Sequence, residues 1–262
     1  MFAALASVRN ALAHVSSVVW LLLDTMQEMG DYIMRGRLPF RLRLFFAQTD
    51  RAGVGSVPLV AMVSFFLGLT MALLTGYQLQ YYGQERLVPR LIAISFSREL
   101  GPLITGIMVA ARIGAAYTAE LGTMTVSEEV EAIEAMGIGP LRFLVAPRVL
   151  AVFLLMPCLS IMSNIAADSG AALISAAQLN IPMRFFWESV VSSLYVRDIV
   201  TGILKSFLFG LIIGLISCYK GLAVKGGAAG VGTATTSSVV TAVTTVIAFD
   251  TVMNIVLIAF EG

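Results

Sequence analysis

The sequence predicts an all-α integral membrane protein with five transmembrane helices and a short cytoplasmic helix between the second and the third. Hydrophobic residues make up 58% of the 262 residues, charged residues only 13%, and the mean hydropathy is +0.89. This composition lies outside the range of soluble domains. A membrane-spanning helix needs about 20 consecutive apolar residues, and such runs occur at 53–79, 89–123, 143–177, 198–219 and 241–260. Residues 53–260 are therefore predicted to form one transmembrane bundle in a single domain, 1–262.

Residues 1–50 are predicted to form an interfacial region that precedes the bundle. Apolar residues recur there at alternating steps of three and four, with charged and polar residues on the other faces: Leu5, Val8, Leu12, Val15, Val19, Leu22, Met26, Met29 and Ile33. An amphipathic helix with this many interrupting charges is expected to lie in the interface plane. A coiled-coil seam is the alternative, because the spacing also fits a heptad repeat.

The distribution of basic residues predicts the orientation of the chain. A cluster of arginines precedes the first apolar run, at Arg35, Arg37, Arg41, Arg43 and Arg51. The positive-inside rule places such a cluster in the cytoplasm. Five spans then put the C-terminus outside, with Arg142, Arg148, Lys220 and Lys225 inside and Arg86, Arg90, Arg184 and Arg197 outside.

An island of charge at 126–148 is predicted to begin with a short amphipathic helix. Thr125 and Glu128 have the spacing of a capping box, and glycines at 137 and 139 followed by Pro140 are expected to end the helix. One side carries Val126, Val130, Ile133 and Gly137, and the others carry Glu128, Glu129, Glu131 and Glu134. A solvated loop is the plain alternative. The apolar stripe instead favours a helix that lies across the membrane face against a partner.

Charged residues inside the predicted spans are the main candidates for a functional site. Arg98 and Glu99 stand just before Gly101 and Pro102, which predict a kinked or broken helix because proline removes a backbone hydrogen bond. Ionisable groups at membrane depth cost about 2.5 to 3.5 kcal/mol each. They are therefore expected either to line a wet or partner-lined surface or to form a structural salt bridge with another span. Lys205 is a further buried charge, with Glu99 or Asp168 as candidate partners.

The remaining patterns indicate helix packing and exclude several kinds of chemistry. Gly106, Ala110 and Gly114 form a small-residue stripe, which allows close helix contacts within the chain or in a dimer. The glycine-rich segment 220–236 has no phosphate-binding motif and is expected to be a flexible cytoplasmic loop. The single histidine and the absence of a metal-ligand cluster argue against an enzyme or a metal protein. Any ATPase must then be a separate subunit.

Four stretches resemble the MlaE permease family and occur in its order: SRELGP at 97–102, ARIGAAYTAELGTM at 111–124, EAMGIGPLRFLVAPR at 134–148, and TATTSSVV followed by FDTV near the C-terminus. The resemblance covers the chain from about Gly53 onward. It implies the permease subunit of an ABC transporter that moves phospholipids between inner and outer membranes and so maintains outer-membrane lipid asymmetry. The implied partners are a second copy of the chain, an ATPase that binds ATP and Mg, an MCE-domain periplasmic ring protein and a small STAS-type subunit. The implied location is the bacterial inner membrane.

The resemblance also implies roles for individual residues. Arg98 and Glu99 would line an outward-facing lipid pocket, with apolar walls from Leu74, Tyr77, Leu79 and Tyr82. The acidic helix would couple the permease to the ATPase through Glu128, Glu129, Glu131, Ile133, Glu134, Met136 and Gly137. The chain itself would hold no cofactor. The alternative is a secondary transporter or channel with an ion relay formed by Arg98, Glu99, Asp168, Lys205 and Asp250.

Overall fold

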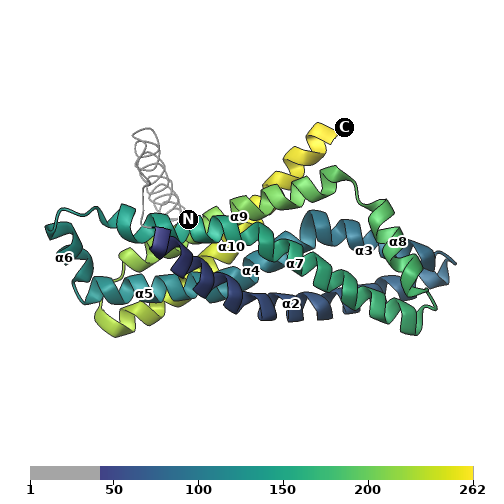
Figure 1. Ribbon diagram of the computed structural model, residues 1–262, viewed down its shortest axis with the longest axis horizontal. Helices are drawn as coiled ribbons and strands as arrows, with labels where there is room; N and C mark the ends of the chain where they lie inside the picture. Colours follow the sequence, from purple (N-terminus) through teal and green to yellow (C-terminus); the bar gives the residue numbers. More distant parts are fainter. Residues whose placement is uncertain (1–41, 262) are drawn as a thin grey trace, which may run out of the picture. The chain divides into compact units, whose positions relative to one another are not determined.

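The computed structural model describes residues 42–261, and every regular element in this range is helical (Figure 1). The predicted interfacial helix in the first 40 residues lies outside the described residues. In chain order the elements are α2 (Leu42–Tyr81), η1 (Glu85–Leu87), α3 (Val88–Ser95), η2 (Phe96–Leu100), α4 (Gly101–Val109), η3 (Ala110–Gly114), α5 (Ala115–Val126), α6 (Glu129–Ala135), η4 (Leu141–Val145), α7 (Ala146–Gln178), α8 (Met183–Ser193), α9 (Val196–Leu222) and α10 (Gly227–Glu261). The all-α prediction is confirmed.

Five helical segments of the described residues are long and apolar enough to cross a membrane, as predicted. They are Gly53–Tyr81, Glu85–Val126, Leu141–Gln178, Val196–Leu222 and Gly227–Ala259. The second segment comprises the elements from η1 to α5, and the third comprises η4 and α7. Each observed segment contains or closely matches one predicted apolar run.

The prediction of a flexible loop at 220–236 is wrong for most of its length, because α10 already begins at Gly227. Only a short connection around Gly226, which has a positive φ of 92°, separates α9 from α10. Serine and threonine are poor helix formers partly because their hydroxyls compete for backbone groups. Here the hydroxyls of Thr235 and Thr236 donate to the carbonyls of Val231 and Gly232 within the helix, which accommodates the polar run.

The second segment is broken at the predicted place. Residues 96–100 form the π-helical turn η2, in which the Gly101 N–H donates to the Phe96 carbonyl five residues back. Pro102 has no N–H to give to the Arg98 carbonyl, which favours an irregular turn at this place. π-Helical turns occur often at functional sites, and this one carries Arg98 and Glu99.

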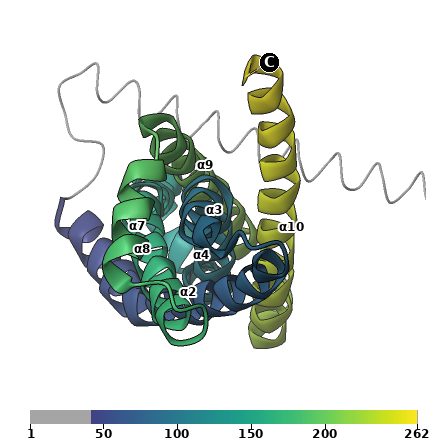
Figure 2. The ribbon, with the colours of Figure 1, turned by 90° about the vertical axis from the view of Figure 1, so that its right-hand side faces the viewer.

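The described residues divide into two compact units. One unit comprises residues 50–109, 153–210 and 245–261. Its core contains large buried side chains from α3, η2 and α8, among them Ile92, Phe96 and Phe186. Figure 2 shows α3 and α8 in this unit, and the two helices are in contact. We call it the cluster unit, because it contains Arg98 and Glu99.

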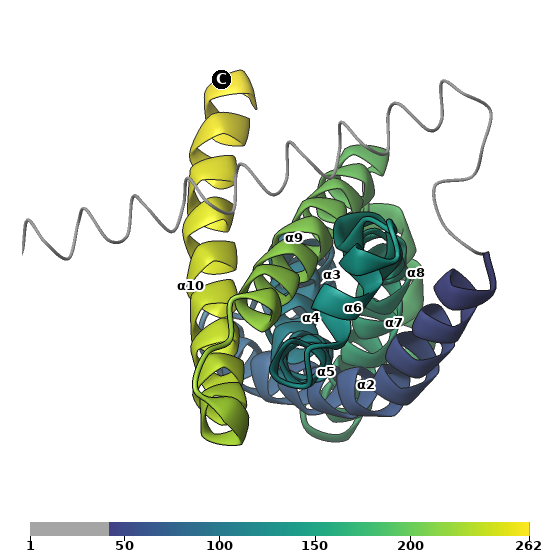
Figure 3. The same cartoon turned by 90° about the vertical axis from the view of Figure 1, so that its left-hand side faces the viewer.

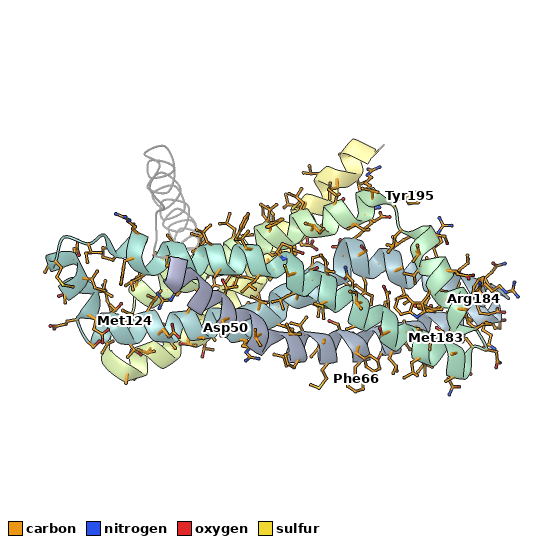
Figure 4. All side chains as sticks on the ribbon, viewed as in Figure 1. Asp50, Phe66, Met124, Met183, Arg184 and Tyr195 are labelled. Atoms are coloured by element: carbon orange, nitrogen blue, oxygen red, sulfur yellow. The ribbon has the colours of Figure 1, made fainter. Side chains whose placement is uncertain are left out.

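Helix α8 lies in the segment 178–196, where Pro182, Phe185, Phe186 and Trp187 predict an interfacial stretch from the sequence. Phe186 and Val190 face the core of the cluster unit, whereas Met183 and Trp187 are exposed. Met183 and Arg184 mark the start of this helix, and Tyr195 follows its end (Figure 4). The helix therefore has an outward surface with aromatic and apolar groups, and its place at the membrane interface stays a prediction.

The other unit comprises residues 42–49, 110–152 and 211–244, and it contains α5 and α6 (Figure 3). We call it the α6 unit. Its core cluster is apolar and consists of Leu121, Leu144, Val145, Val149, Leu215 and Cys218. The buried Thr118 hydroxyl lies 3.0 Å from the Ser217 carbonyl and 2.8 Å from the Ser238 hydroxyl, which joins α5 to α9 and α10.

Candidate functional site

A fully buried lysine is the centre of a polar cluster in the cluster unit. Lys205 on α9 has 0% of its side chain exposed. Its Nζ forms an ion pair and hydrogen bond with Glu99 Oε2 on η2, and it lies 2.9 Å from Asp250 Oδ1 on α10. It also donates to Asn254 Oδ1 at 2.7 Å. An ammonium group away from water is tolerated only when it is paired and hydrogen-bonded, and these three contacts meet that requirement.

Asn254 links the two carboxylates of this cluster. Its amide nitrogen lies 2.5 Å from Glu99 Oε1 and 3.5 Å from Asp250 Oδ2. The amide thus holds two acidic groups around one ammonium. Sequence reasoning missed Asn254 because it carries no charge. Its position four residues after Asp250 on the same helix was the available signal.

Arg98 belongs to a second ion pair in the same unit. Its Nη1 lies 3.6 Å from Asp198 Oδ1 near the start of α9, and Asp198 also accepts a hydrogen bond from the Tyr195 N–H. Asp198 was not predicted as a partner. The side chains of Arg98 and Glu99 are both 32% exposed, whereas Asp198, Lys205 and Asp250 are buried. The cluster therefore presents one guanidinium and one carboxylate at its surface.

Asp168 is not part of this cluster. It is buried on α7, and its Oδ1 has no hydrogen-bond partner among the described residues. Of the two partners considered for Lys205, the structure selects Glu99. The five residues considered for an ion relay are thus not one connected set. Glu99, Lys205 and Asp250 meet, while Arg98 is paired with Asp198.

The predicted apolar walls come from the end of α2 and the turn after it. Leu74, Tyr77 and Tyr82 are exposed, with Tyr77 reaching 77%, so their side chains are available to a ligand. Leu79 instead packs against the core of the cluster unit. Leu79 is only partly buried, so its placement in a pocket wall stays a prediction.

Helix α6 lies between the second and third spanning segments, as predicted (Figure 1). The predicted capping box is wrong. Thr125 still belongs to α5, and its hydroxyl donates to the Leu121 carbonyl at 2.9 Å. The chain turns at Glu128, which has a left-handed φ of 60°, and no side chain caps α6. The end is as predicted, with Gly137 at a φ of 74° and the Ile138 N–H bonded to the Ile133 carbonyl.

The two faces of α6 differ as the stripe predicted. Val130 and Ile133 pack against the core cluster of the α6 unit. The opposite surface is open to solvent or to a partner, and it comprises Glu128, Glu129, Glu131, Glu134, Met136 and Gly137. Two of the four residues of the predicted apolar stripe therefore serve this chain, whereas Val126 and Gly137 are exposed. A partner would meet four acidic side chains and Met136, which is 67% exposed.

The small residues Gly106, Ala110 and Gly114 are all buried. A Cβ added at Gly106 would meet Val246, Phe209 and Met156 of the cluster unit. One added at Gly114 would lie 2.8 Å from the Ser217 hydroxyl of α9. These residues thus allow close packing within the chain, and the stripe offers little surface for a dimer contact.

Comparison with known proteins identifies the family. The family model described as permease MlaE matches residues 45–256. The chain belongs to the MlaE permease family. It is therefore a multi-pass membrane protein and a permease of the ABC-transporter class.

Three relatives illustrate the breadth of this family. A probable ABC transporter permease protein of Rickettsia typhi is 38% identical over 77% of this chain and 78% of its own length. A chloroplastic protein of Arabidopsis thaliana, named trigalactosyldiacylglycerol 1, is 36% identical over 91% of this chain and 69% of its own. A probable ABC transporter permease protein of Synechocystis is 34% identical over 80% and 79%. The similarity covers both units described above.

Proposed function

We propose that the chain is the permease subunit of an ABC-type transporter that moves phospholipids between the inner and outer membranes. The observation that carries this proposal is the surface of the cluster unit. Arg98 and Glu99 are partly exposed on a π-helical turn inside the second spanning segment. The same unit exposes Leu74, Tyr77 and Tyr82. A lipid needs apolar walls for its acyl chains and a few polar contacts for its head group.

The charges of the cluster suit a head group better than a free ion. Lys205 and Asp250 are buried, and both carboxylate oxygens of Glu99 have partners. The partly exposed guanidinium and carboxylate could contact the phosphate and the polar substituent of a phospholipid. The Arabidopsis relative bears the name of a galactolipid, trigalactosyldiacylglycerol, which also supports a glycerolipid as the cargo.

Helix α6 is proposed to connect the permease to a separate ATPase subunit, which would bind ATP and Mg. Its four exposed glutamates form an acidic surface that would suit a basic groove. Val130 and Ile133 anchor the helix to its own unit, so a push on α6 would be transmitted to α5, α7 and α9. Rigid displacement of a packed element is a common way to transmit closure.

The proposed assembly follows the family resemblance. Two copies of the chain would form the permease, with the ATPase and a STAS-type subunit on the cytoplasmic side and an MCE-domain ring on the periplasmic side. The location would be the bacterial inner membrane, with the N-terminus in the cytoplasm and the C-terminus in the periplasm. The cluster of arginines before the first span supports this orientation.

Photocrosslinking tests the lipid site. A photoreactive residue at Tyr77 or Tyr82 is expected to capture phospholipid that stays bound during purification in mild detergent. Val252 on α10 is a matched control, because it is exposed on the same unit but is not one of the proposed wall residues. Equal capture at Val252 would indicate general annular lipid. Capture only at Val252 would place the site elsewhere.

The family disfavours a secondary transporter, although Glu99, Lys205 and Asp250 do meet in the structure. An ion relay of this kind would work without ATP. Transport by the chain alone, driven by an ion gradient in proteoliposomes, would support the relay. Dependence on ATP and on a co-purified ATPase would support the permease.

A further inference from the structure

Arg148, close to the start of α7, is a buried cation whose contacts join the helices on both sides of α6. Only 8% of its side chain is exposed. Its Nη2 donates to Glu120 Oε2 on α5 at 3.1 Å, and its Nη1 donates to the Leu144 carbonyl on η4 at 2.9 Å. Its guanidinium carbon lies 5.8 Å from the centre of the Tyr117 ring on α5. All four residues belong to the α6 unit.

The contact with Leu144 stabilises an irregular turn. Residues 141–145 form the π-helical turn η4, which follows the short connection after α6. Carbonyls in such turns depart from the regular ladder of α-helical hydrogen bonds. The Arg148 guanidinium gives the Leu144 carbonyl an additional donor. A planar guanidinium can bond a carbonyl and a carboxylate while it lies over an aromatic ring, whereas an ammonium group cannot reproduce that geometry.

The apolar contacts of α6 involve the same segments that Arg148 joins. Val130 and Ile133 pack on a cluster that includes Leu121 of α5, Leu144 of η4 and Val149 of α7. Leu144 accepts the hydrogen bond of Arg148, and Val149 is its neighbour in the chain. Helix α6 is thus seated on the segments that the Arg148 side chain holds together.

We propose that Arg148 is a positioning residue that makes α5, α6 and the start of α7 move as one body. This inference rests on the proposed role of α6 in contacting an ATPase. Without the contact to Glu120, a displacement of α6 would be absorbed at the η4 turn and at the left-handed residue Glu128. With it, the displacement reaches two spanning segments together. The expected phenotype is a transporter that hydrolyses ATP but moves less lipid for each ATP consumed.

The partner of Arg148 offers a mild way to test this role. The Glu120 side chain is 39% exposed, so Glu120→Gln removes the negative charge at the edge of the core without opening a cavity. Arg148→Lys keeps the positive charge but loses the simultaneous contacts to Glu120 and Leu144. Glu188→Gln is the matched control, because Glu188 forms an exposed ion pair with Arg184 at 2.8 Å on α8.

The experiment uses the full chain purified with the ATPase that accompanies it and reconstituted in phospholipid vesicles. Lipid transfer and ATP hydrolysis are measured on the same sample. For Glu120→Gln and Arg148→Lys, we expect normal co-purification, ATP hydrolysis within about twofold of the wild type, and roughly a tenfold fall in lipid moved per ATP, a size typical of coupling between sites. Glu188→Gln is expected to keep the wild-type ratio.

Two results would overturn the inference. An unchanged ratio in both variants would show that the contact does not transmit movement. Loss of the ATPase from Glu120→Gln would show that the pair serves only to hold the fold. Failure of the wild-type chain to bring down any ATPase is a different outcome, because it would remove the proposed function itself.

Discussion

Lys205 donates a hydrogen bond to Glu99, although the two residues are 106 positions apart in the sequence. Lys205 lies on α9, and Glu99 lies on the π-helical turn η2 of the second spanning segment. Asp250 on α10 approaches the same ammonium at 2.9 Å. Three spanning segments are thus linked through one cation.

Lys205→Met is expected to destabilise the protein by about 3 to 5 kcal/mol, the range observed when one partner of a buried ion pair is removed. The substitution keeps the length of the side chain but leaves Glu99 and Asp250 without the cation between them. Thermal unfolding in detergent measures the loss. The triple variant Lys205→Met with Glu99→Gln and Asp250→Asn removes all the charges, so it should recover much of the stability. An unfolding temperature equal to that of the wild type for Lys205→Met would show that the ion pair is dispensable.

Leu79→Ala and Tyr77→Ala should differ in their effects. Leu79 packs on the core of the cluster unit, so its truncation should lower stability by about 1 to 2 kcal/mol, less than for a fully buried leucine. Tyr77 is 77% exposed, so its truncation should leave stability unchanged and reduce the amount of co-purified phospholipid. Thermal unfolding and lipid extraction from the same preparation give both readouts. If the two variants lost equal amounts of lipid and had equal stability, the assignment of Leu79 to the core and of Tyr77 to the pocket wall would be wrong.

The sequence predicts the spans and the acidic helix well because both depend on local periodicity and composition. The break near Pro102 was also predictable, because a missing N–H has a local effect. Glu99 was one of two candidate partners of Lys205, but the choice was not predictable, since nothing local distinguishes Glu99 from Asp168 as its counterion. Asn254 was missed because it carries no charge, and its contacts form where α10 meets η2 and α9.

Capping and loop predictions failed where tertiary contacts changed the local outcome. Thr125 has a capping spacing, but its hydroxyl is used inside α5, where it also lies 3.5 Å from the Gly221 carbonyl of α9. The Gly- and Thr-rich run at 227–236 looked like a loop by composition. It is helical, and the hydroxyls of Thr235 and Thr236 are bonded to carbonyls one turn back in the same helix.

Gly202→Ala is expected to disturb the contact between α9 and η2. An added Cβ would lie only 1.9 Å from the Ser97 carbonyl oxygen, which is backbone and cannot rotate away. Overpacking of this kind costs about 1 to 3 kcal/mol or more, and unfolding in detergent measures it. Gly232→Ala is the control, because nothing lies within 4 Å of its Cβ position on α10. There the loss of glycine flexibility should stabilise the helix by about 0.5 to 1 kcal/mol. Similar behaviour of the two variants would contradict the close approach at Gly202.

Charge reversal on α6 tests the docking surface most directly. The combined change of Glu128, Glu131 and Glu134 to lysine should release the ATPase, because a basic groove would then face like charges. The three side chains are exposed, whereas the helix is held to its unit by Val130 and Ile133, so the spans should remain folded. Co-purification measures binding, and thermal unfolding checks the fold. Glu85→Lys and Glu188→Lys, on η1 and α8 of the cluster unit, change charge away from α6 and should retain the ATPase. Retention of the ATPase by the α6 variant would show that the acidic surface serves another purpose.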